Sequence, residues 1–173
     1  YLKMKEGNPD SILFYRLGDF YEMFFEDAKL VSQELDLVLT GRSAGVEEKV
    51  PMCGIPFHAA NSYIQRLVKK GYKVAICEQL EDPSSAKGLV DRGIIKIITP
   101  GTYMDATMDA KSTNYMASCD VSSFEITVIY CELSTGELKY QTLQRSLVAL
   151  QKALLEQNVS ELVCPMTMDK KWM

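Results

Sequence analysis

The chain has 173 residues, 47% of them hydrophobic, which is enough apolar material for one complete core and part of a second. No apolar run approaches the ~18 residues of a membrane span and no signal peptide is visible, so we expect a soluble, cytoplasmic protein without membrane partners. The net charge is −4 and neither half is basic, so any contact with nucleic acid must be local or supported by other domains.

Strand and helix patterns alternate along the first hundred residues. Runs of aliphatic, β-branched and aromatic residues predict strands, and apolar residues three or four apart predict helices. Strands are predicted over 12–17, 36–40, 50–55, 72–77 and 93–99, one helix from about 25 with Ala28, Val31, Leu35 and Leu37 inward, and a second over 59–70 with Ala59, Tyr63, Leu67 and Val68 inward. Loops are predicted over 41–49 and 82–88. The alternation indicates an α/β domain over residues 1–105.

The rest of the chain predicts a second, partial domain. Residues 106–112 are polar and mixed and are interpreted as a linker. Within 113–173 the pattern predicts a hairpin with strands 124–133 and 138–143, a helix over 147–157 and a strand over 161–164. These elements are too few to close a core, so we expect further strands beyond Met173. Together with the missing initiator methionine, this predicts a fragment of a longer protein.

The motifs of the common enzyme classes are missing. The sequence has no glycine-rich phosphate loop, no G-x-S-x-G and no H-E-x-x-H. His58, the only histidine, is interpreted as a residue at a helix start that hydrogen-bonds the backbone. Asp120, Glu125 and Glu132 could serve a two-metal nuclease, but acids on an exposed hairpin are more simply a solvated face. We therefore expect no enzyme activity, no cofactor and no metal in this chain.

The cysteines are widely spaced and form no C-x-x-C pair. With a single histidine in the chain, they have little to complete a zinc site. We expect reduced, mostly buried thiols at Cys53, Cys77, Cys119, Cys131 and Cys164.

The most informative segment is Gly18–Glu22, which follows a predicted strand. If its backbone is extended, Phe20 and Glu22 share one face while Tyr21 points the opposite way. A projecting phenyl ring can insert between base steps and kink a duplex, and unstacking costs least at a mispaired or unpaired base. On spacing alone, the alternative in which Phe20 is a buried core residue and Glu22 a surface residue is favoured.

The carboxylate of Glu22 is unusual beside a phosphate backbone, which repels it. It becomes useful if it hydrogen-bonds a base that the distortion makes accessible. We hypothesise that desolvation and nearby phosphates leave the Glu22 carboxyl protonated, so that it can donate to a ring nitrogen. An aromatic wedge and an acid on one face would then detect how easily a base pair of the duplex is distorted, independently of the base sequence.

Four separated segments resemble the N-terminal domain of the MutS mismatch-repair family. They are FYRLGDFYEMFFEDA (14–28), PMCGIPFHA (51–59), VAICEQLEDP (74–83) and ITPGT (98–102), in that order. The Phe-x-Glu motif of the family falls on Phe20 and Glu22. The resemblance implies a mixed-sheet α/β mismatch-binding domain followed by part of a connector domain of RNase H-like fold.

The resemblance also implies roles and partners. The phenyl ring of Phe20 would stack on a mispaired base from the minor groove, and Glu22 would hydrogen-bond that base. By position, the neighbouring contacts would come from Gly18, Asp19, Tyr21, Arg42, Pro51 and Met52. Apart from the resemblance, Arg42 and Lys96 on the last predicted strand are candidate phosphate partners, although isolated charges of this kind are more often simply solvent-exposed. Glu47 and Glu48 depart from what a DNA-facing loop prefers and leave that loop's contacts in doubt.

The family as a whole binds duplex DNA with mismatches or small insertion and deletion loops. It forms homodimers, engages a MutL-type partner and hydrolyses ATP with Mg²⁺ through a C-terminal domain that is missing from this sequence. Two other functions stay open from the residues alone. The chain could be a protein-interaction α/β module with Phe20 as its hydrophobic anchor, or a small-molecule-binding α/β domain, which the missing phosphate loop disfavours.

Overall fold

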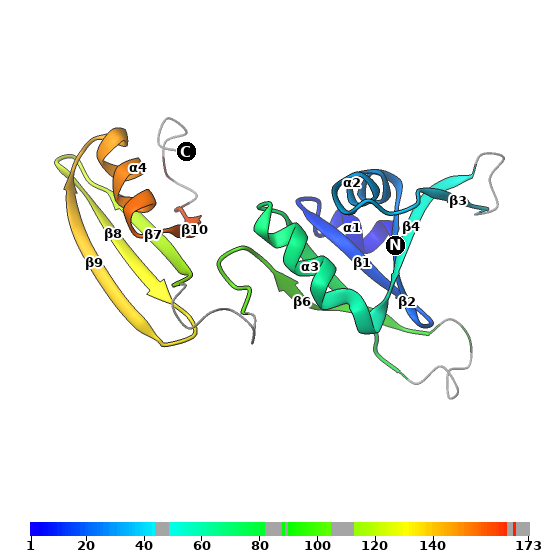
Figure 1. The fold of residues 1–173 in the computed structure, drawn as a ribbon. Coiled ribbons are helices and arrows are strands. Elements are labelled where there is room, and N and C mark those ends of the chain that lie inside the picture. Colours follow the sequence, from blue (N-terminus) through cyan, green and yellow to red (C-terminus); the bar gives the residue numbers. More distant parts are fainter. Residues whose placement is uncertain (44–48, 82–87, 89, 105–112, 166–167, 169–173) are drawn as a thin grey trace. The chain divides into compact units, whose positions relative to one another are not determined.

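The structure is a computed structural model that describes residues 1–43, 49–81, 88, 90–104, 113–165 and 168 (Figure 1). It divides into two units, Tyr1–Thr99 and Pro100–Met173. The predicted linker 106–112 lies outside the described residues, so the predicted domain limits 1–105 and 113–173 stay a prediction. No helix in the described part of the chain has the length and apolar character to cross a membrane.

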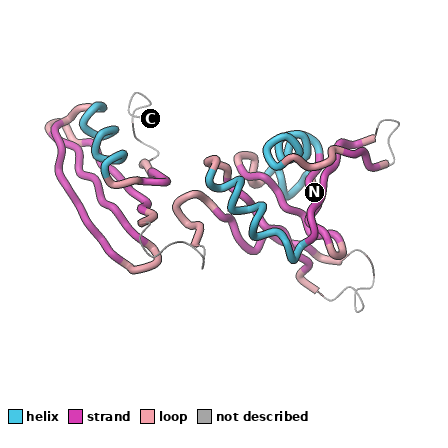
Figure 2. The backbone as a smooth tube through the Cα atoms, viewed as in Figure 1, coloured by secondary structure: helices cyan, strands magenta, loops and turns pink. Residues whose placement is uncertain are grey.

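The first unit is built on a six-stranded mixed sheet with helices on both faces (Figure 2). Its elements are α1 (Leu2–Glu6), β1 (Ser11–Leu17), β2 (Phe20–Phe24), α2 (Phe25–Leu35), β3 (Thr40–Arg42), β4 (Val50–Pro56), a 3-10 turn (Phe57–Ala59), α3 (Ala60–Lys69), β5 (Lys73–Gln79) and β6 (Arg92–Ile98). The strand order is β3-β4-β2-β1-β5-β6, and only β1 and β5 run parallel. The mixed α/β fold predicted from the sequence is confirmed.

The two longer helices of this unit cover one face of the sheet. Helices α2 and α3 contact each other, and α2 also contacts β2 and β4 while α3 contacts β5. The Cys53 thiol on β4 donates to the carbonyl oxygen of Ala28 in α2 at 3.5 Å. On the opposite face Leu13, Ala75 and Cys77 form a small buried cluster against α1. The sheet is therefore buried on both faces near β1 and β5.

Asp27 ties α1, β1 and α2 together. Its buried carboxylate accepts from Tyr1 Oη at 2.7 Å, from Lys5 Nζ at 2.8 Å and from the backbone N–H of Leu13 at 3.0 Å. Burial, reinforced by the Asp27 carboxylate, raises the pKa of the Tyr1 phenol above its usual range. Sequence periodicity placed Asp27 at the helix start but did not reveal its burial, because all three donors lie far away in sequence.

Several predicted elements of the first unit need correction. Helix α2 begins at Phe25 directly after β2 ends, and Phe25 has a positive φ of 54°. The short strand predicted over 36–40 is wrong, because Asp36 ends α2 in the left-handed conformation and the strand is β3, Thr40–Arg42. Strand β2 was not predicted, because an extended backbone was considered only as a condition for Gly18–Glu22, between the predicted strand 12–17 and the predicted helix.

The inward face of α3 also differs from the prediction. Ala60 and Ile64 are buried with Leu67 and Val68, in place of Ala59 and Tyr63. The 3-10 turn Phe57–Ala59 delays the helix start, so the helix periodicity is counted from Ala60. In α2, Ala28, Val31 and Leu35 are buried as predicted, whereas Leu37 lies beyond the helix end.

The second unit is a four-stranded sheet covered by one helix. Its elements are β7 (Tyr115–Val121), β8 (Glu125–Glu132), β9 (Glu137–Gln144), α4 (Leu147–Glu156) and β10 (Val159–Val163). The order is β10-β7-β8-β9, with β10 parallel to β7. The predicted hairpin, helix and final strand are present. Ser146 caps α4 by accepting from the N–H of Ala149 at 3.5 Å.

Strand β7 was missed by the sequence analysis. Two of its three inward residues, Ala117 and Cys119, are small and give a weak strand signal, and only Tyr115 is large. With β7 present the unit encloses a buried cluster that includes Ile126, Tyr130 and Leu150. The expectation of too few elements for a core is therefore wrong for the described part of this unit, and further strands beyond Met173 stay an expectation.

Candidate nucleic-acid interface

The β1–β2 hairpin presents Phe20 and Glu22 on one face of the sheet. Gly18 forms the turn with a φ of 57°, a conformation that glycine adopts without steric cost. Phe20 opens β2 with 47% of its surface exposed, and Glu22 is half-buried two residues on. Tyr21 between them is only 7% exposed and points to the opposite face, which α2 and α3 cover. The alternative of a buried Phe20 is excluded by this exposure.

Tyr21 anchors the hairpin from beneath. Its ring packs against Phe14 with 5.9 Å between centroids, and its hydroxyl donates to the carboxylate of Glu78 on β5. Burial, together with the hydrogen bond to Glu78, raises the pKa of Tyr21 to about 12. Tyr21 therefore remains a neutral donor at physiological pH and fixes the β1–β2 hairpin to β5 from within the fold.

The turn itself is bound to the end of β4. The guanidinium of Arg16 lies 3.7 Å from the ring centroid of Phe57, and Arg16 Nε donates to the carbonyl oxygen of Gly18 at 2.5 Å. The backbone N–H of Phe57 donates to the carbonyl oxygen of Asp19 at 3.0 Å. Arg92 Nε in turn donates to the carbonyl oxygen of Arg16 at 2.9 Å. These contacts hold the residues that precede Phe20 in one position.

Glu22 is paired with Arg42 in this structure. Arg42 Nη1 donates to Glu22 Oε2, and the two residues belong to β3 and β2, which lie on either side of β4. Gly54 is the β4 residue opposite Glu22. A Cβ at Gly54 would lie 3.6 Å from Glu22 Cγ and 3.4 Å from the carbonyl oxygen of Tyr21. These are ordinary contact distances, so the backbone of Gly54 lies directly beneath the Glu22 side chain.

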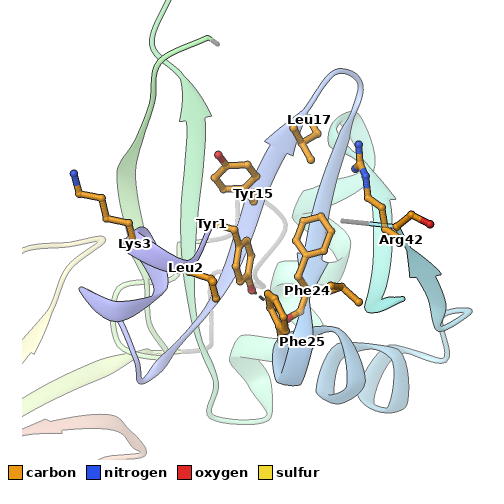
Figure 3. Close-up of a pocket in the computed structure, with 10 residues that line it drawn as sticks. Tyr1, Leu2, Lys3, Tyr15, Leu17, Phe24, Phe25 and Arg42 are labelled. Atoms are coloured by element: carbon orange, nitrogen blue, oxygen red, sulfur yellow. Dashed lines mark hydrogen bonds between the residues drawn. The ribbon is translucent and has the colours of Figure 1, made fainter. Parts of the chain in front are cut away.

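A hollow of about 540 Å³ opens beside this pair (Figure 3). It is lined by Tyr1, Leu2, Lys3, Tyr15, Leu17, Phe24, Phe25, Arg42, Ser43 and Val50. Tyr15 and Leu17 are the β1 partners of Glu22 and Phe20, so all four side chains share one face of the sheet. Apolar surface therefore continues from Phe20 along β1 and β2 toward α1.

The other predicted contact residues are distributed over both faces. Met52 pairs with Phe24 and lies on the face of Phe20 and Glu22, whereas Pro51 alternates to the helix-covered side. Lys96 is exposed on β6, at the opposite edge of the sheet from β3. Because Lys96 pairs with Ile76, on the helix-covered side, the fold does not bring it to the face of Phe20. Asp19 is exposed in the turn beside Gly18.

Arg16, Phe57, Glu78 and Gly54 were not singled out from the sequence. Alternation along β1 could have placed Arg16 on the face of Tyr21, its pairing partner, but the ion-pair partner of Arg16, Glu78, lies 62 residues away. Phe57 belongs to a segment that supported the family resemblance, yet nothing local predicts that it stacks on Arg16. These residues act through tertiary contacts that periodicity does not report.

The fold does not bring together the three acids considered for a nuclease, Asp120, Glu125 and Glu132, because Glu132 lies at the opposite end of β8 from Glu125. Glu132 is buried and accepts from Ser134 and from both the N–H and hydroxyl of Thr135, so it holds the β8–β9 turn. These hydrogen bonds lower the pKa of Glu132 to about 2. Its interpretation as part of a solvated face is wrong, while Asp120 and Glu125 are exposed. Among the described residues no group of His, Cys, Asp and Glu side chains has the arrangement of a metal site.

The five cysteines are free thiols, and the histidine lies at the surface. Cys53, Cys77 and Cys119 are buried, Cys131 and Cys164 are half-buried, and all are free thiols as predicted. Burial raises the pKa of the Cys53 thiol to about 11, which keeps it protonated. His58 is exposed in the turn before α3, with its ring edge-on to Phe57 at 5.9 Å.

Comparison with known proteins gives a consistent result. Residues 1–107 match the family model described as MutS domain I. The chain is 53% identical over 171 residues to the DNA mismatch repair protein MutS of Clostridium botulinum (strain Loch Maree / Type A3), covering 93% of this chain and 18% of that protein. It is 59% identical over 140 residues to the protein of the same name from Clostridium novyi (strain NT), covering 80% of this chain and 15% of that protein. The chain thus spans less than a fifth of the length of these relatives.

Proposed function

The chain belongs to the MutS family, and on this premise we propose that its first unit recognises mispaired or unpaired bases in duplex DNA. The observation that carries the proposal is the placement of Phe20 and Glu22. Both emerge from one face of β2, with Phe20 at the hairpin end, while Tyr21 is buried beneath them. A half-exposed ring on a braced hairpin is suited to enter a base step, because its own position costs little further ordering on binding.

In this proposal Phe20 stacks on the base from the minor groove and Glu22 hydrogen-bonds the same base. Unstacking costs a few kcal/mol and is cheapest where pairing is already lost, so selectivity comes from deformability. Gly18 and Asp19 directly precede Phe20, whereas Met52 lies on the same face but opposite Phe24, at the other end of β2. Arg42, bound to Glu22, is the nearby cation for a phosphate. Lys96, on the other face and edge, would contact DNA only if the duplex or another subunit extends there.

We also propose that this chain takes part in the activities of a full-length MutS-type protein. We expect ATP and Mg²⁺ to be bound by a C-terminal domain outside this sequence, and this part to have no enzyme activity of its own. The second unit, in which three antiparallel strands are followed by a helix and a parallel strand, is compatible with an RNase H-like connector. Homodimerisation, a MutL-type partner and a place in the bacterial cytosol with the chromosome follow from family membership.

Fluorescence anisotropy tests the wedge in a full-length MutS-type protein that carries this segment. Matched, G·T and one-base-insertion duplexes are titrated at one fixed salt concentration, since affinity depends steeply on salt. Wild type should favour the two defective duplexes, and Phe20→Ala should remove that preference. Phe124→Ala, which truncates an 89% exposed phenylalanine of the second unit, is the matched control and should leave the preference intact.

The same titration separates the alternative functions. If wild type binds all three duplexes equally, or if Phe20→Ala retains the mismatch preference, the proposed recognition role is wrong. A Phe20 anchor for a protein partner would then be the better interpretation of its exposure.

A further inference from the structure

In this structure the Glu22 carboxylate has a cationic partner. Arg42 donates to it from the edge strand β3, with side-chain exposures of 17% for Glu22 and 48% for Arg42. Both side chains lie on the face of Phe20, because Arg42 pairs with Val50 and Glu22 with Gly54, two positions of the same parity on β4. The acid and the cation proposed to meet DNA are therefore bound to each other beforehand.

A duplex offers each member of this pair a competing partner. Phosphate oxygens are strong acceptors for a guanidinium, and Arg42 is exposed enough to reach them. The carboxylate has no such partner on a matched duplex, where bases are stacked and phosphates repel it. Releasing Arg42 from Glu22 on matched DNA would therefore gain a phosphate contact and leave an unpaired anion beside other phosphates.

We infer that Arg42 is a latch on Glu22 that opens only when a base accepts the acid. On matched duplex Arg42 stays on Glu22; on mismatched duplex Glu22 passes to the exposed base and Arg42 passes to a phosphate. This inference rests on the proposed function of Phe20 and Glu22. Its consequence is that one accessible base yields two contacts, so Arg42 is a specificity-determining residue as well as a phosphate partner.

The salt dependence of binding tests the latch directly. Each phosphate contact that is lost flattens the slope of log K against log salt concentration by about one. In the full-length protein, Arg42→Gln should flatten this slope by about one on a G·T duplex and leave it unchanged on the matched duplex. An equal change on both duplexes would show that Arg42 is an ordinary phosphate contact and would overturn the latch.

Glu22→Gln supplies an independent measurement. Without the carboxylate the latch is absent, so Arg42 is free on both duplexes and the matched-duplex slope should steepen by about one relative to wild type. In this background Arg42→Gln should flatten the slope equally on matched and mismatched DNA. A matched-duplex slope unchanged by Glu22→Gln would contradict the inference.

Controls separate this inference from the proposed function. Lys96→Gln removes an exposed cation on the opposite face, and any slope change it causes should be the same on both duplexes and independent of Glu22. Phe20→Ala is measured in parallel. Loss of mismatch preference in Phe20→Ala with equal Arg42→Gln slopes rejects the latch alone, whereas retained preference rejects the proposed function and the latch with it.

Discussion

Replacing Arg16 by methionine should loosen the turn that carries Phe20 while leaving the surrounding core in place. Methionine keeps an apolar stem of similar length but removes the guanidinium that lies 3.7 Å from the Phe57 ring centroid and donates to Gly18 at 2.5 Å. A partly exposed cation–π contact contributes about 0.5–1 kcal/mol, and an exposed hydrogen bond of this kind about 1 kcal/mol. The ion pair of Arg16 with Glu78, at 3.5 Å, adds little.

The two contacts together predict a loss of about 1–2 kcal/mol of local stability. A free-energy change of about 1.4 kcal/mol corresponds to a tenfold change in an equilibrium constant. This loss can be measured by amide hydrogen exchange of Phe57, because the Phe57 N–H donates to the carbonyl oxygen of Asp19 across the base of the turn. Exchange of this amide should accelerate about 5- to 30-fold in Arg16→Met. The control Lys29→Met, on the exposed surface of α2, should change it little.

Two outcomes would refute this reasoning. An unchanged Phe57 exchange rate would show that Arg16 does not brace the turn. A uniform acceleration throughout residues 1–99 would show that Arg16 stabilises the whole unit and not the turn. Mismatch affinity in the full-length protein should fall by at most the same factor, since a loosened turn lowers only the fraction of molecules that are ready to bind.

Two further predictions concern stability. Asp27→Ala should lower the free energy of unfolding of the first unit by about 2–4 kcal/mol in urea titrations, because it leaves the buried N–H of Leu13 without an acceptor, and Asp10→Ala, which removes an exposed ion pair, should cost under about 1 kcal/mol. Glu132→Gln should lower the melting temperature of the second unit at pH 7, as followed by circular dichroism. Because the pKa of Glu132 is lowered to about 2 in the folded state, its stabilisation is present above about pH 4.5 and is lost as pH falls toward 2, so the difference from wild type should shrink over that window; a constant difference would contradict the assignment.

Local patterns predicted the elements that have large apolar residues at regular spacing. Val31 and Leu35 fixed the face of α2, and the alternation of Ile126, Val128 and Tyr130 fixed β8. The patterns failed where small residues or turns intervene. Ala117 and Cys119 concealed β7, and the 3-10 turn before α3 moved the buried positions of its first turns by one residue, from Ala59 and Tyr63 to Ala60 and Ile64.

The candidate site was predictable to the level of one strand. Alternation placed Phe20 and Glu22 together and Tyr21 opposite, which the exposures confirm. The partners of these residues come from other strands, so their identity depends on sheet order. Arg42 reaches Glu22 only because β4 lies between β3 and β2, and no spacing in the sequence reveals that arrangement.

The junction between β2 and α2 has a mechanical consequence. Phe24 ends the strand and Phe25 begins the helix, so the chain changes direction at a single residue with φ of 54° and no connecting loop. Strand β2 therefore cannot move relative to α2 by rearrangement of a linker. If Phe20 enters a bent duplex as proposed, the force on β2 would be transmitted through this junction to α2 and its packed core.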